Sequence, residues 1–245
     1  MKTQTIANKI KAKNTTIPDL ILDSLNSDVF PGWQFVAQEK IPVRIVSYSL
    51  IKRCIDLIIS IFGLLLTAPL FLFIAILIKI DSRGPVFFKQ KRCGKDGKEF
   101  TLYKFRTMIV DAEKYKKRLK SKNEMQGPIF KIKNDPRVTR TGKWLRKFSL
   151  DELPQLINVL KGEMSLVGPR PLNREELRGN LVWKNLRLTV KPGITGPWQV
   201  NIRSLGTFED MVNWDLYYVK NKSILLDVQI LLKTPGVVLS GKGAY

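Results

Sequence analysis

The dominant feature of the hydrophobic pattern is an uncharged run over residues 57–78, LIISIFGLLLTAPLFLFIAILI. A helix rises about 1.5 Å per residue, so this run can cross a hydrocarbon core of about 30 Å. It begins too far from Met1 for a secretory signal peptide, and no small-residue cleavage pattern follows it. The run therefore predicts a membrane-associated protein and not a buried helix of a soluble core.

Two features of this run bear on its topology. Basic residues flank it on both sides, so the positive-inside rule gives no direction: Lys52 and Arg53 before it, Lys79 and Arg83 after it. Ala68-Pro69 lies mid-run, where a proline kinks a helix and Thr67 can contact a freed carbonyl. Both features favour a re-entrant helix hairpin broken at Ala68 and Pro69, and a straight, kinked span is the alternative.

After the membrane run the pattern changes to apolar–polar alternation. Residues 86–91 and 99–105 alternate on either side of Gly94-Lys95-Asp96-Gly97, which is typical of a β-hairpin. Further on, Thr207 and Ser223 stand in N-cap positions before helical patterns over 208–219 and 224–234. The apolar stripe of the last helix indicates either core packing or an interfacial helix on the membrane surface.

Candidate chemistry concentrates in residues 146–171, RKFSLDELPQLINVLKGEMSLVGPRP. Ser149 and Glu152 match a capping box ahead of a helix that ends at Lys161-Gly162. The apolar face of that helix is Leu153, Leu156, Ile157 and Leu160. Asp151 and Glu152 would then lie in its first turn, where free N–H groups favour anions. Such carboxylates can hold magnesium, and one can attack phosphorus; simple helix capping is the alternative.

Charge narrows the classes of partner. The chain has 42 Lys and Arg against 21 Asp and Glu, a net charge of +21. The partner is therefore anionic: nucleic acid, a membrane surface or phosphorylated small substrates. Basic residues bracket the carboxylate pair in sequence and suit a pyrophosphate. They are Lys104, Arg106, Arg146 and Arg170.

The absence of histidine excludes several chemistries. Ser-His-Asp and Cys-His catalysis, HExxH metal sites and an imidazole base all require it. Cys54 and Cys93 stand far apart in the chain, which argues against a disulfide scaffold and a cysteine zinc site. Neither a Walker loop nor a GxGxxG is present, so a nucleotide must be bound by another device.

The order of motifs resembles the monotopic phosphoglycosyl transferase family, also called bacterial sugar transferases, which includes undecaprenyl-phosphate sugar-phosphotransferases. The matching pieces extend over about residues 51–245. They are KRCIDLIIS with the Pro-broken run, GPVFFKQKR, YKFRTM, GPIFKIKNDPRVTRTGKWLRKFSLDELPQLINVLKGEMSLVGPRP, VKPGITGPWQV and DLYYVKNKSILLDVQILLKT.

The resemblance implies an α+β fold. We expect a monotopic membrane protein with a re-entrant Pro-broken helix, a small β-hairpin and a mainly helical cytosolic catalytic domain. The expected divisions are an N-terminal arm (1–50), a re-entrant membrane helix hairpin (51–84) and a catalytic domain with interfacial helices (85–245). The implied location is the bacterial inner (cytoplasmic) membrane, with the catalytic domain on the cytoplasmic face.

The resemblance also implies a ping-pong reaction. A sugar-1-phosphate passes from a UDP-sugar to polyprenyl (undecaprenyl) phosphate and UMP is released, as the first membrane step of exopolysaccharide, O-antigen or related glycan assembly. Asp151 matches the catalytic nucleophile, which forms a phospho-sugar aspartyl intermediate. Glu152 matches a ligand of the Mg²⁺ cofactor, to which we also assign Asp151.

The expected phosphate-binding residues are Lys104, Arg146 and Arg170, which match the family's basic residues, together with Arg106 and Arg203. The partners are a UDP-sugar, polyprenyl phosphate and anionic membrane lipids, with no nucleic acid. A homo-oligomer is compatible with the sequence, which does not determine the oligomeric state, the sugar or the uridine contacts.

The sequence departs from the family pattern at two places. Ala68-Pro69 replaces the frequent Ser-Pro, so no serine hydroxyl stands at the break. Asn201-Ile202-Arg203 follows PGITGPWQV, where a small residue or Asn and then Gly-Arg are common.

Two rival functions remain: a membrane-tethered binder of nucleic acid or another anionic polymer, with its basic residues in one stripe, and an ordinary glycosyltransferase that releases UDP.

Overall fold

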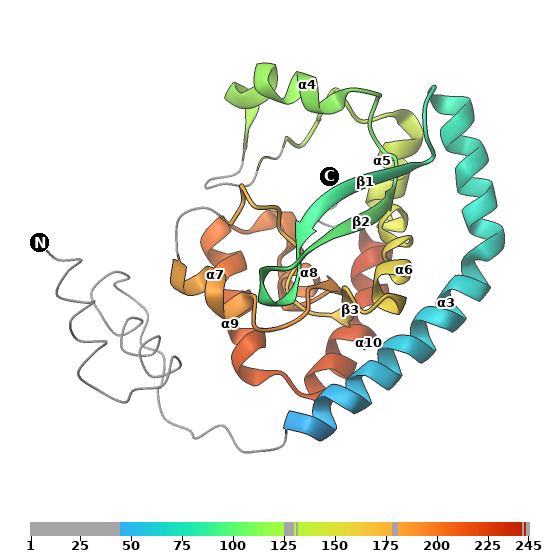
Figure 1. Cartoon of the computed structure of the whole chain (residues 1–245). Helices are drawn as coiled ribbons and strands as arrows, with labels where there is room; N and C mark the ends of the chain where they lie inside the picture. The colour runs from blue at the N-terminus through green and yellow to red at the C-terminus, as the bar shows by residue number, and fades with distance from the viewer. Residues whose placement is uncertain (1–44, 125–129, 131, 178–180, 242, 244–245) are drawn as a thin grey trace, which may run out of the picture. The chain divides into compact units, whose positions relative to one another are not determined.

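The computed structural model describes residues 45–124, 130, 132–177, 181–241 and 243. The expected N-terminal arm lies outside the described residues as far as position 44. The described residues from 45 onward form one compact unit, in which helices surround two small sheets (Figure 1). The mixed α and β composition agrees with the predicted α+β class.

The α-helices of the described residues are α3 (Ile45–Asp81), α4 (Ala112–Lys116), α5 (Arg140–Lys147), α6 (Gln155–Leu160), α7 (Leu181–Arg187), α8 (Pro197–Asn201), α9 (Phe208–Asn221) and α10 (Ile224–Ser240). Short 3-10 helices are η1 (Lys95–Gly97), η2 (Lys117–Lys122), η3 (Leu150–Glu152) and η4 (Arg203–Leu205). The strands are β1 (Phe87–Cys93), β2 (Glu99–Phe105), β3 (Ser165–Val167) and β4 (Gly193–Thr195).

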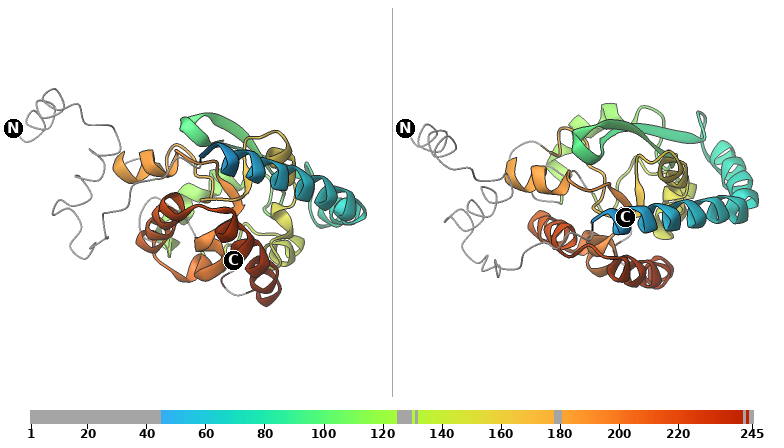
Figure 2. Two further views of the ribbon diagram at one scale, coloured as in Figure 1. Left: turned by 90° about the horizontal axis from the view of Figure 1, so that it is seen from below. Right: turned by 60° about the horizontal axis from the view of Figure 1, so that its bottom comes forward.

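Helix α3 contains the whole apolar run and is, among the described helices, the one long and apolar enough to cross a membrane. Residue 51, where the membrane segment was expected to begin, lies inside it. Figures 1 and 2 show that α3 bends near its middle and that the bend projects beyond the rest of the unit. Large apolar side chains are exposed there, including Phe62, Leu66 and Leu72, with Leu66 83% exposed.

The bend has a local chemical basis at Thr67 and Pro69. Pro69 lies inside the helix and has no N–H for the carbonyl of Leu65. Thr67 Oγ1 donates to the carbonyl of Gly63 at 2.6 Å, a bond that often bends helices. Thr67 was expected to contact the carbonyl freed by Pro69, and that detail is wrong because its hydroxyl reaches back four residues.

Both ends of α3 are attached to the same compact unit. Near the N-terminal end, Arg53 donates to two carbonyls at the end of α6, at 2.6 and 2.8 Å, and Asp56 accepts from Ser165 Oγ at 3.0 Å. Near the C-terminal end, Asp81 accepts from the backbone N–H of Thr141 at 2.9 Å. A straight helix of 37 residues would separate its ends by about 55 Å. The bend allows both ends to contact one domain.

The predicted β-hairpin is confirmed. β1 and β2 pair antiparallel, with Phe87 opposite Phe105 and Cys93 opposite Glu99. The parallel pair of β3 and β4, with Ser165 opposite Gly193, was not predicted. Three-residue strands are too short to show alternation, and these two are far apart in the chain.

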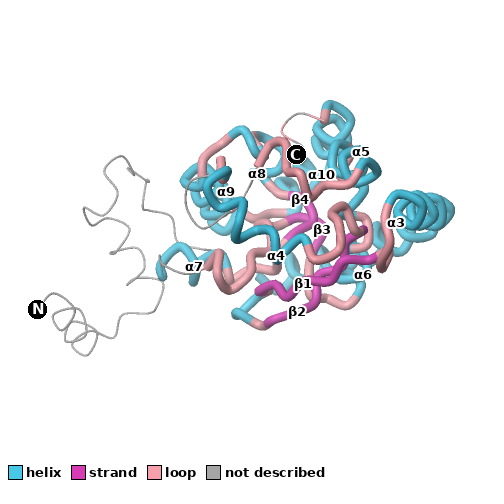
Figure 3. The backbone as a smooth tube through the Cα atoms, turned by 90° about the horizontal axis from the view of Figure 1, so that it is seen from above, coloured by secondary structure: helices cyan, strands magenta, loops and turns pink. Residues whose placement is uncertain are grey.

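The main core forms where β2, α6, β3, α9 and α10 meet. Its most deeply buried members are Leu102, Val159, Met164, Val167 and Tyr218. Figure 3 shows β3 and β4 at the centre of the unit with helices on several sides. The core therefore joins the segment after α6 to the two C-terminal helices.

The predicted N-caps of the C-terminal helices are confirmed. Thr207 and Ser223 accept from the backbone N–H groups of Asp210 and Leu226, at 3.1 and 3.2 Å. The expected end of α10 at Thr234 is wrong, because the helix continues through Pro235 to Ser240. One proline removes one helical hydrogen bond, and the apolar residues that follow continue the pattern.

Candidate active site

Asp151 and Glu152 lie in η3, between α5 and α6. The predicted capping box is wrong: Ser149 adopts a left-handed backbone (φ 52°, ψ 21°) and makes no cap hydrogen bond. Its Oγ instead accepts from Arg203 Nη2 at 2.6 Å. The expected single helix is also wrong, since α6 begins at Gln155 after Pro154. The carboxylate pair therefore lies in a separate tight turn before the α-helix.

The leucines on either side of the pair hold this turn against the membrane helix. Leu150 and Leu153 pack against a buried cluster that includes Ile74 and Ile78 of α3 and Phe105 of β2. Both leucines are partly buried, so each contributes less than the roughly 1.5–3 kcal/mol of a fully buried apolar side chain. The carboxylates are thereby fixed beside the C-terminal half of α3.

Cations from separate elements approach the pair. Lys104 on β2 forms an ion pair with Glu152. Arg146 on α5 donates from Nε to Thr107 Oγ1 at 3.0 Å. Burial lowers the pKa of Arg146, while the negative charge of Asp151 counteracts this shift. Arg146 is therefore held by its hydrogen bond to Thr107 with its charge close to Asp151.

Arg203 and Arg170 complete the group. Burial lowers the pKa of Arg203, and the charges of Asp151 and Glu152 oppose that change. Arg170 follows β3, and its charge helps to lower the pKa of Glu152. Throughout the part of the chain that the structure describes, the Arg170 guanidinium donates no hydrogen bond to protein, so it is available for a ligand.

Arg106 is not brought to this site. Its guanidinium donates to the carbonyls of Ser82, at 2.7 Å, and Arg83. Burial lowers the pKa of Arg106, and Asp81 is the negative charge that opposes the change. Arg106 therefore holds the C-terminal end of α3, and we do not include it in the phosphate-binding group.

The two neighbouring carboxyl groups differ in acidity. Burial raises the pKa of Asp151 to about 6, and the negative charge of Glu152 adds to the increase. Burial alone would raise the pKa of Glu152 too, but Lys104, Arg170 and Arg92 outweigh it and lower this pKa. At neutral pH both groups are ionised, with Asp151 the more basic and therefore the better nucleophile.

Two groups near the site were missed by sequence reasoning. Arg92 is buried, and its charge acts on Glu152. Asp135 is buried, binds Arg137 at 2.6 Å and places its charge near Arg146. Both residues stand in motifs quoted above, Arg92 in GPVFFKQKR and Asp135 in the block that begins GPIFKIKNDPRV, but nothing local distinguishes a buried charged residue from a solvated one.

The residues present fit a magnesium ion. Mg²⁺ retains several waters and is usually held by one or two carboxylates together with substrate phosphates. Asp151 and Glu152 supply two adjacent carboxylates whose mutual repulsion a divalent cation would relieve. The described residues contain no cluster of three or more metal-binding side chains, and a site shared with substrate does not need one.

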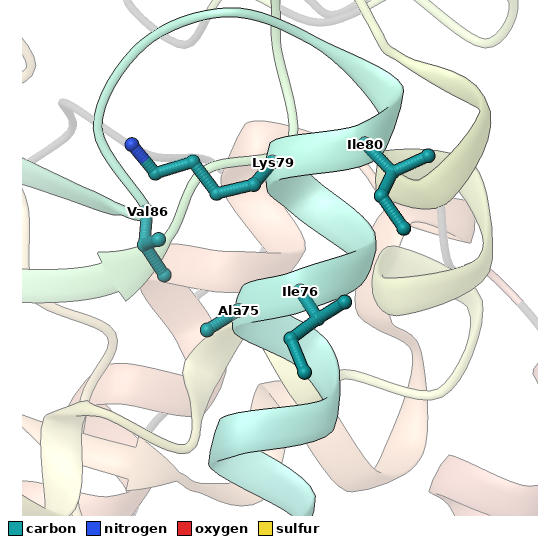
Figure 4. Close-up of a pocket in the computed structure, with 5 residues that line it drawn as sticks. All are labelled: Ala75, Ile76, Lys79, Ile80 and Val86. Atoms are coloured by element: carbon teal, nitrogen blue, oxygen red, sulfur yellow. The ribbon is translucent and has the colours of Figure 1, made fainter.

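An apolar hollow of about 360 Å³ lies beside the last turns of α3. Its lining residues are Ala75, Ile76, Lys79, Ile80 and Val86. Figure 4 shows the Lys79 side chain extending from the helix toward the segment that carries Val86. The hollow combines an apolar lining with one cation, which suits a lipid chain close to its charged head.

Comparison with known proteins gives concordant relatives. Residues 47–241 match the sequence model of a family described as bacterial sugar transferase. The chain is 40% identical to galactosyl transferase CpsE of Streptococcus agalactiae, over 98% of this chain and 55% of that protein. It is 42% identical to undecaprenyl-phosphate galactose phosphotransferase of Salmonella typhimurium, over 81% of this chain and 42% of that protein.

A shorter relative matches over almost its whole length. The exopolysaccharide production protein ExoY of Rhizobium meliloti is 39% identical, over 86% of this chain and 95% of that protein. The chain spans about half the length of the first two relatives. The similarity therefore concerns the portion that contains the membrane helix and the carboxylate pair.

Proposed function

The chain belongs to the bacterial sugar transferase family, and we propose that it transfers a sugar-1-phosphate from a UDP-sugar to polyprenyl phosphate and releases UMP. The observation that carries this proposal is the convergence of Lys104, Arg146, Arg170 and Arg203 on a carboxylate pair beside α3. The names of two relatives, a galactose and an N-acetylgalactosamine phosphotransferase acting on undecaprenyl phosphate, support it.

The proposed chemistry proceeds through Asp151 in two steps. An Asp151 carboxylate oxygen bonds to the sugar-linked phosphorus, and the bond from that phosphorus to the bridging oxygen breaks, so UMP leaves with the electron pair. A phosphate oxygen of the acceptor then attacks the same phosphorus and displaces Asp151. The products are a polyprenyl diphosphate sugar and the restored carboxylate. Because the nucleophile is already ionised at neutral pH, no histidine base is required.

The cations stabilise the charge of the diphosphate. Arginine donates two parallel bonds to phosphate oxygens, and fixed positive charge in a partly dry site lowers the barrier where negative charge develops. Mg²⁺ is the proposed cofactor, held by Asp151 and Glu152, and when bound it supplies further positive charge to phosphate oxygens. The fit of the adjacent carboxylates supports this assignment.

We further propose that α3 is a re-entrant hairpin in the inner membrane, with the catalytic unit on the cytoplasmic face. The attachment of both helix ends to one unit supports this topology, as do the basic residues on both flanks. The acceptor is a membrane lipid, so it would approach from the side of α3. The hollow beside Lys79 supports that approach, and anionic lipids suit the net charge of +21.

The rival functions predict different arrangements or products. A binder of anionic polymers needs its basic residues along one continuous stripe. Four of the expected cations instead come from β2, α5, the loop after β3 and η4 toward one carboxylate pair, which favours the enzyme. An ordinary glycosyltransferase would attack the sugar carbon and release UDP.

Nucleotide release tests the proposal directly. Purified full-length protein is incubated with magnesium, polyprenyl phosphate and each of a panel of UDP-sugars, and the nucleotide product is separated by chromatography. We expect UMP from at least one UDP-sugar, and none from Asp151→Asn. Asp111→Asn, an exposed aspartate outside the site, is the matched control. UDP as the product, or no nucleotide from any sugar, would overturn the proposed function.

A further inference from the structure

Two buried ion pairs lie against the loop that carries Arg170. Arg187, at the end of α7, contacts Asp215 of α9 at 2.8 Å, with 4% and 2% of their side chains exposed. Arg92 on β1 contacts Glu176 at 2.6 Å, with 8% and 11% exposed. Buried pairs contribute little net stability compared with apolar side chains of the same volume. Their occurrence on both sides of one loop therefore calls for a role beyond stability.

Each of these arginines also donates to the loop itself. Arg187 Nη2 donates to the carbonyl of Arg170 at 2.7 Å, and Arg92 Nη1 donates to the carbonyl of Pro171 at 3.2 Å. The carbonyls on either side, of Pro169 and Leu172, accept from backbone N–H groups of the neighbouring segments, at 2.9 and 2.8 Å. Every carbonyl from residue 169 to residue 172 is thus held by another element.

The loop cannot provide this order from its own backbone. Pro169 and Pro171 have no N–H groups, so the loop has few donors with which to form a turn. Its carbonyls must be paired from outside, and two of them are paired by arginine side chains. The ion pairs with Asp215 and Glu176 neutralise those arginines, which would otherwise repel the nearby guanidinium of Arg170. The backbone of Arg170 is fixed while its side chain is left for a ligand.

We propose that Arg187–Asp215 and Arg92–Glu176 are positioning pairs that hold Arg170 for the diphosphate of the nucleotide donor. This inference rests on the proposed function and adds the residues that position one of its phosphate-binding arginines. The pairs do not touch the substrate. They act through the Arg170 backbone, and the guanidinium then meets diphosphate oxygens beside Glu152 with little freedom left to lose on binding.

A charge-neutral replacement tests the proposal without leaving a buried charge. Arg187→Met combined with Asp215→Leu removes the donor to the Arg170 carbonyl and both charges together. We expect the double variant to remain folded by circular dichroism and thermal unfolding. We expect kcat/KM for the UDP-sugar to fall about 10- to 100-fold, as for Arg170→Ala, because misplaced substrate groups cost rates of that order. Arg174→Ala, an exposed arginine nearby, is the matched control and should behave like wild type.

Combination with Arg170→Ala separates positioning from a general structural role. If the pair acts through Arg170, the double replacement produces no additional loss in an Arg170→Ala background, whereas independent effects multiply. The proposal is overturned if the double variant keeps the kcat/KM of wild type, or if its loss of kcat/KM multiplies with the loss caused by Arg170→Ala.

The affinity for UDP can be measured without turnover, so it tests the positioning pairs separately from the proposed function. Calorimetry on the detergent-solubilised full chain should show a Kd for UDP that rises to the same extent in Arg170→Ala and in the double variant. A wild-type protein that binds UDP but releases no UMP would refute the transfer reaction while leaving the positioning pairs supported by this shift. A double variant that binds UDP with the wild-type Kd would refute positioning by Arg187–Asp215, and a wild-type protein that binds no UDP would refute both positioning pairs.

Discussion

Lys104 forms its ion pair with Glu152 and not with the neighbouring Asp151. Among the described residues no cation forms an ion pair with the Asp151 carboxylate, although Arg146 and Lys104 are near enough to act on it. Glu152 is thus held in place by a partner, and Asp151 keeps its oxygens available. The two carboxylates differ in their contacts because the fold gives them different neighbours.

The first prediction is that Asp151 carries the covalent bond. Asp151→Asn should abolish turnover and the burst of UMP released without acceptor, a loss on the order of 10⁶ where a nucleophile is removed. Glu152→Gln should retain a slow burst and need more magnesium. Intact-protein mass spectrometry after UDP-sugar alone should show one added sugar-phosphate in wild type. An adduct on Asp151→Asn would contradict the assignment.

The second prediction concerns stability in the absence of magnesium. The pKa of Asp151 is raised to about 6 in the folded protein, so folding favours the protonated form. The stability gained by that form is complete below the unfolded pKa of about 4 and is lost as pH rises through 6. At pH 7.5 the ionised group therefore costs stability, by at most about 3 kcal/mol.

Asp151→Asn should consequently raise the midpoint of thermal unfolding at pH 7.5, by about 2–4 °C for each kcal/mol recovered. Differential scanning fluorimetry with and without magnesium measures this. Magnesium should raise the midpoint of wild type more than that of Asp151→Asn, since the variant lacks one carboxylate ligand. An equal effect of magnesium on both proteins would argue against Asp151 as a ligand.

The third prediction concerns pH dependence. The burst rate should fall about tenfold per pH unit at acid pH, because only ionised Asp151 attacks. The pKa of about 6 is that of the metal-free site, so bound magnesium should place this acid limb below pH 6. Lys104 lowers the pKa of Asp151, so Lys104→Met should move this acid limb to higher pH. Lys161→Met, which alters an exposed lysine on the adjacent helix end, is the control and should leave the limb in place. An unchanged limb in Lys104→Met would contradict the electrostatic assignment.

The fourth prediction concerns topology. Residues at the two ends of α3 should both face the cytoplasm. Leu50→Cys and Arg83→Cys place thiols at exposed positions, in a Cys54→Ser background that removes the exposed native thiol. Neither should react in intact cells with a reagent that cannot cross the inner membrane, and both should react after permeabilisation. Labelling of Leu50→Cys in intact cells would favour the straight span.

Local periodicity was sufficient for the elements whose pattern repeats over several residues. The apolar run of α3, the alternation of β1 and β2 and the N-caps Thr207 and Ser223 were all predicted correctly. Each depends on hydrogen bonds or side-chain spacing within one segment. The pair Asp151 and Glu152 could also be singled out as a candidate, since adjacent carboxylates and motif order are visible in the chain itself.

Only the tertiary structure decided which cationic side chains lie near Asp151 and Glu152. Ser149 accepts a bond from Arg203 and has a left-handed backbone instead of forming a capping box, and Arg106 donates to the end of α3 although it lies two residues from Lys104. The positioning pair of Arg187 and Asp215 likewise joins two helices. The sequence determined what each segment could form and which candidate carboxylates and cations the chain carries. Where each long cationic side chain lies depended on its hydrogen-bond partners in distant segments. No local sequence pattern encodes those partners or how deeply they are buried.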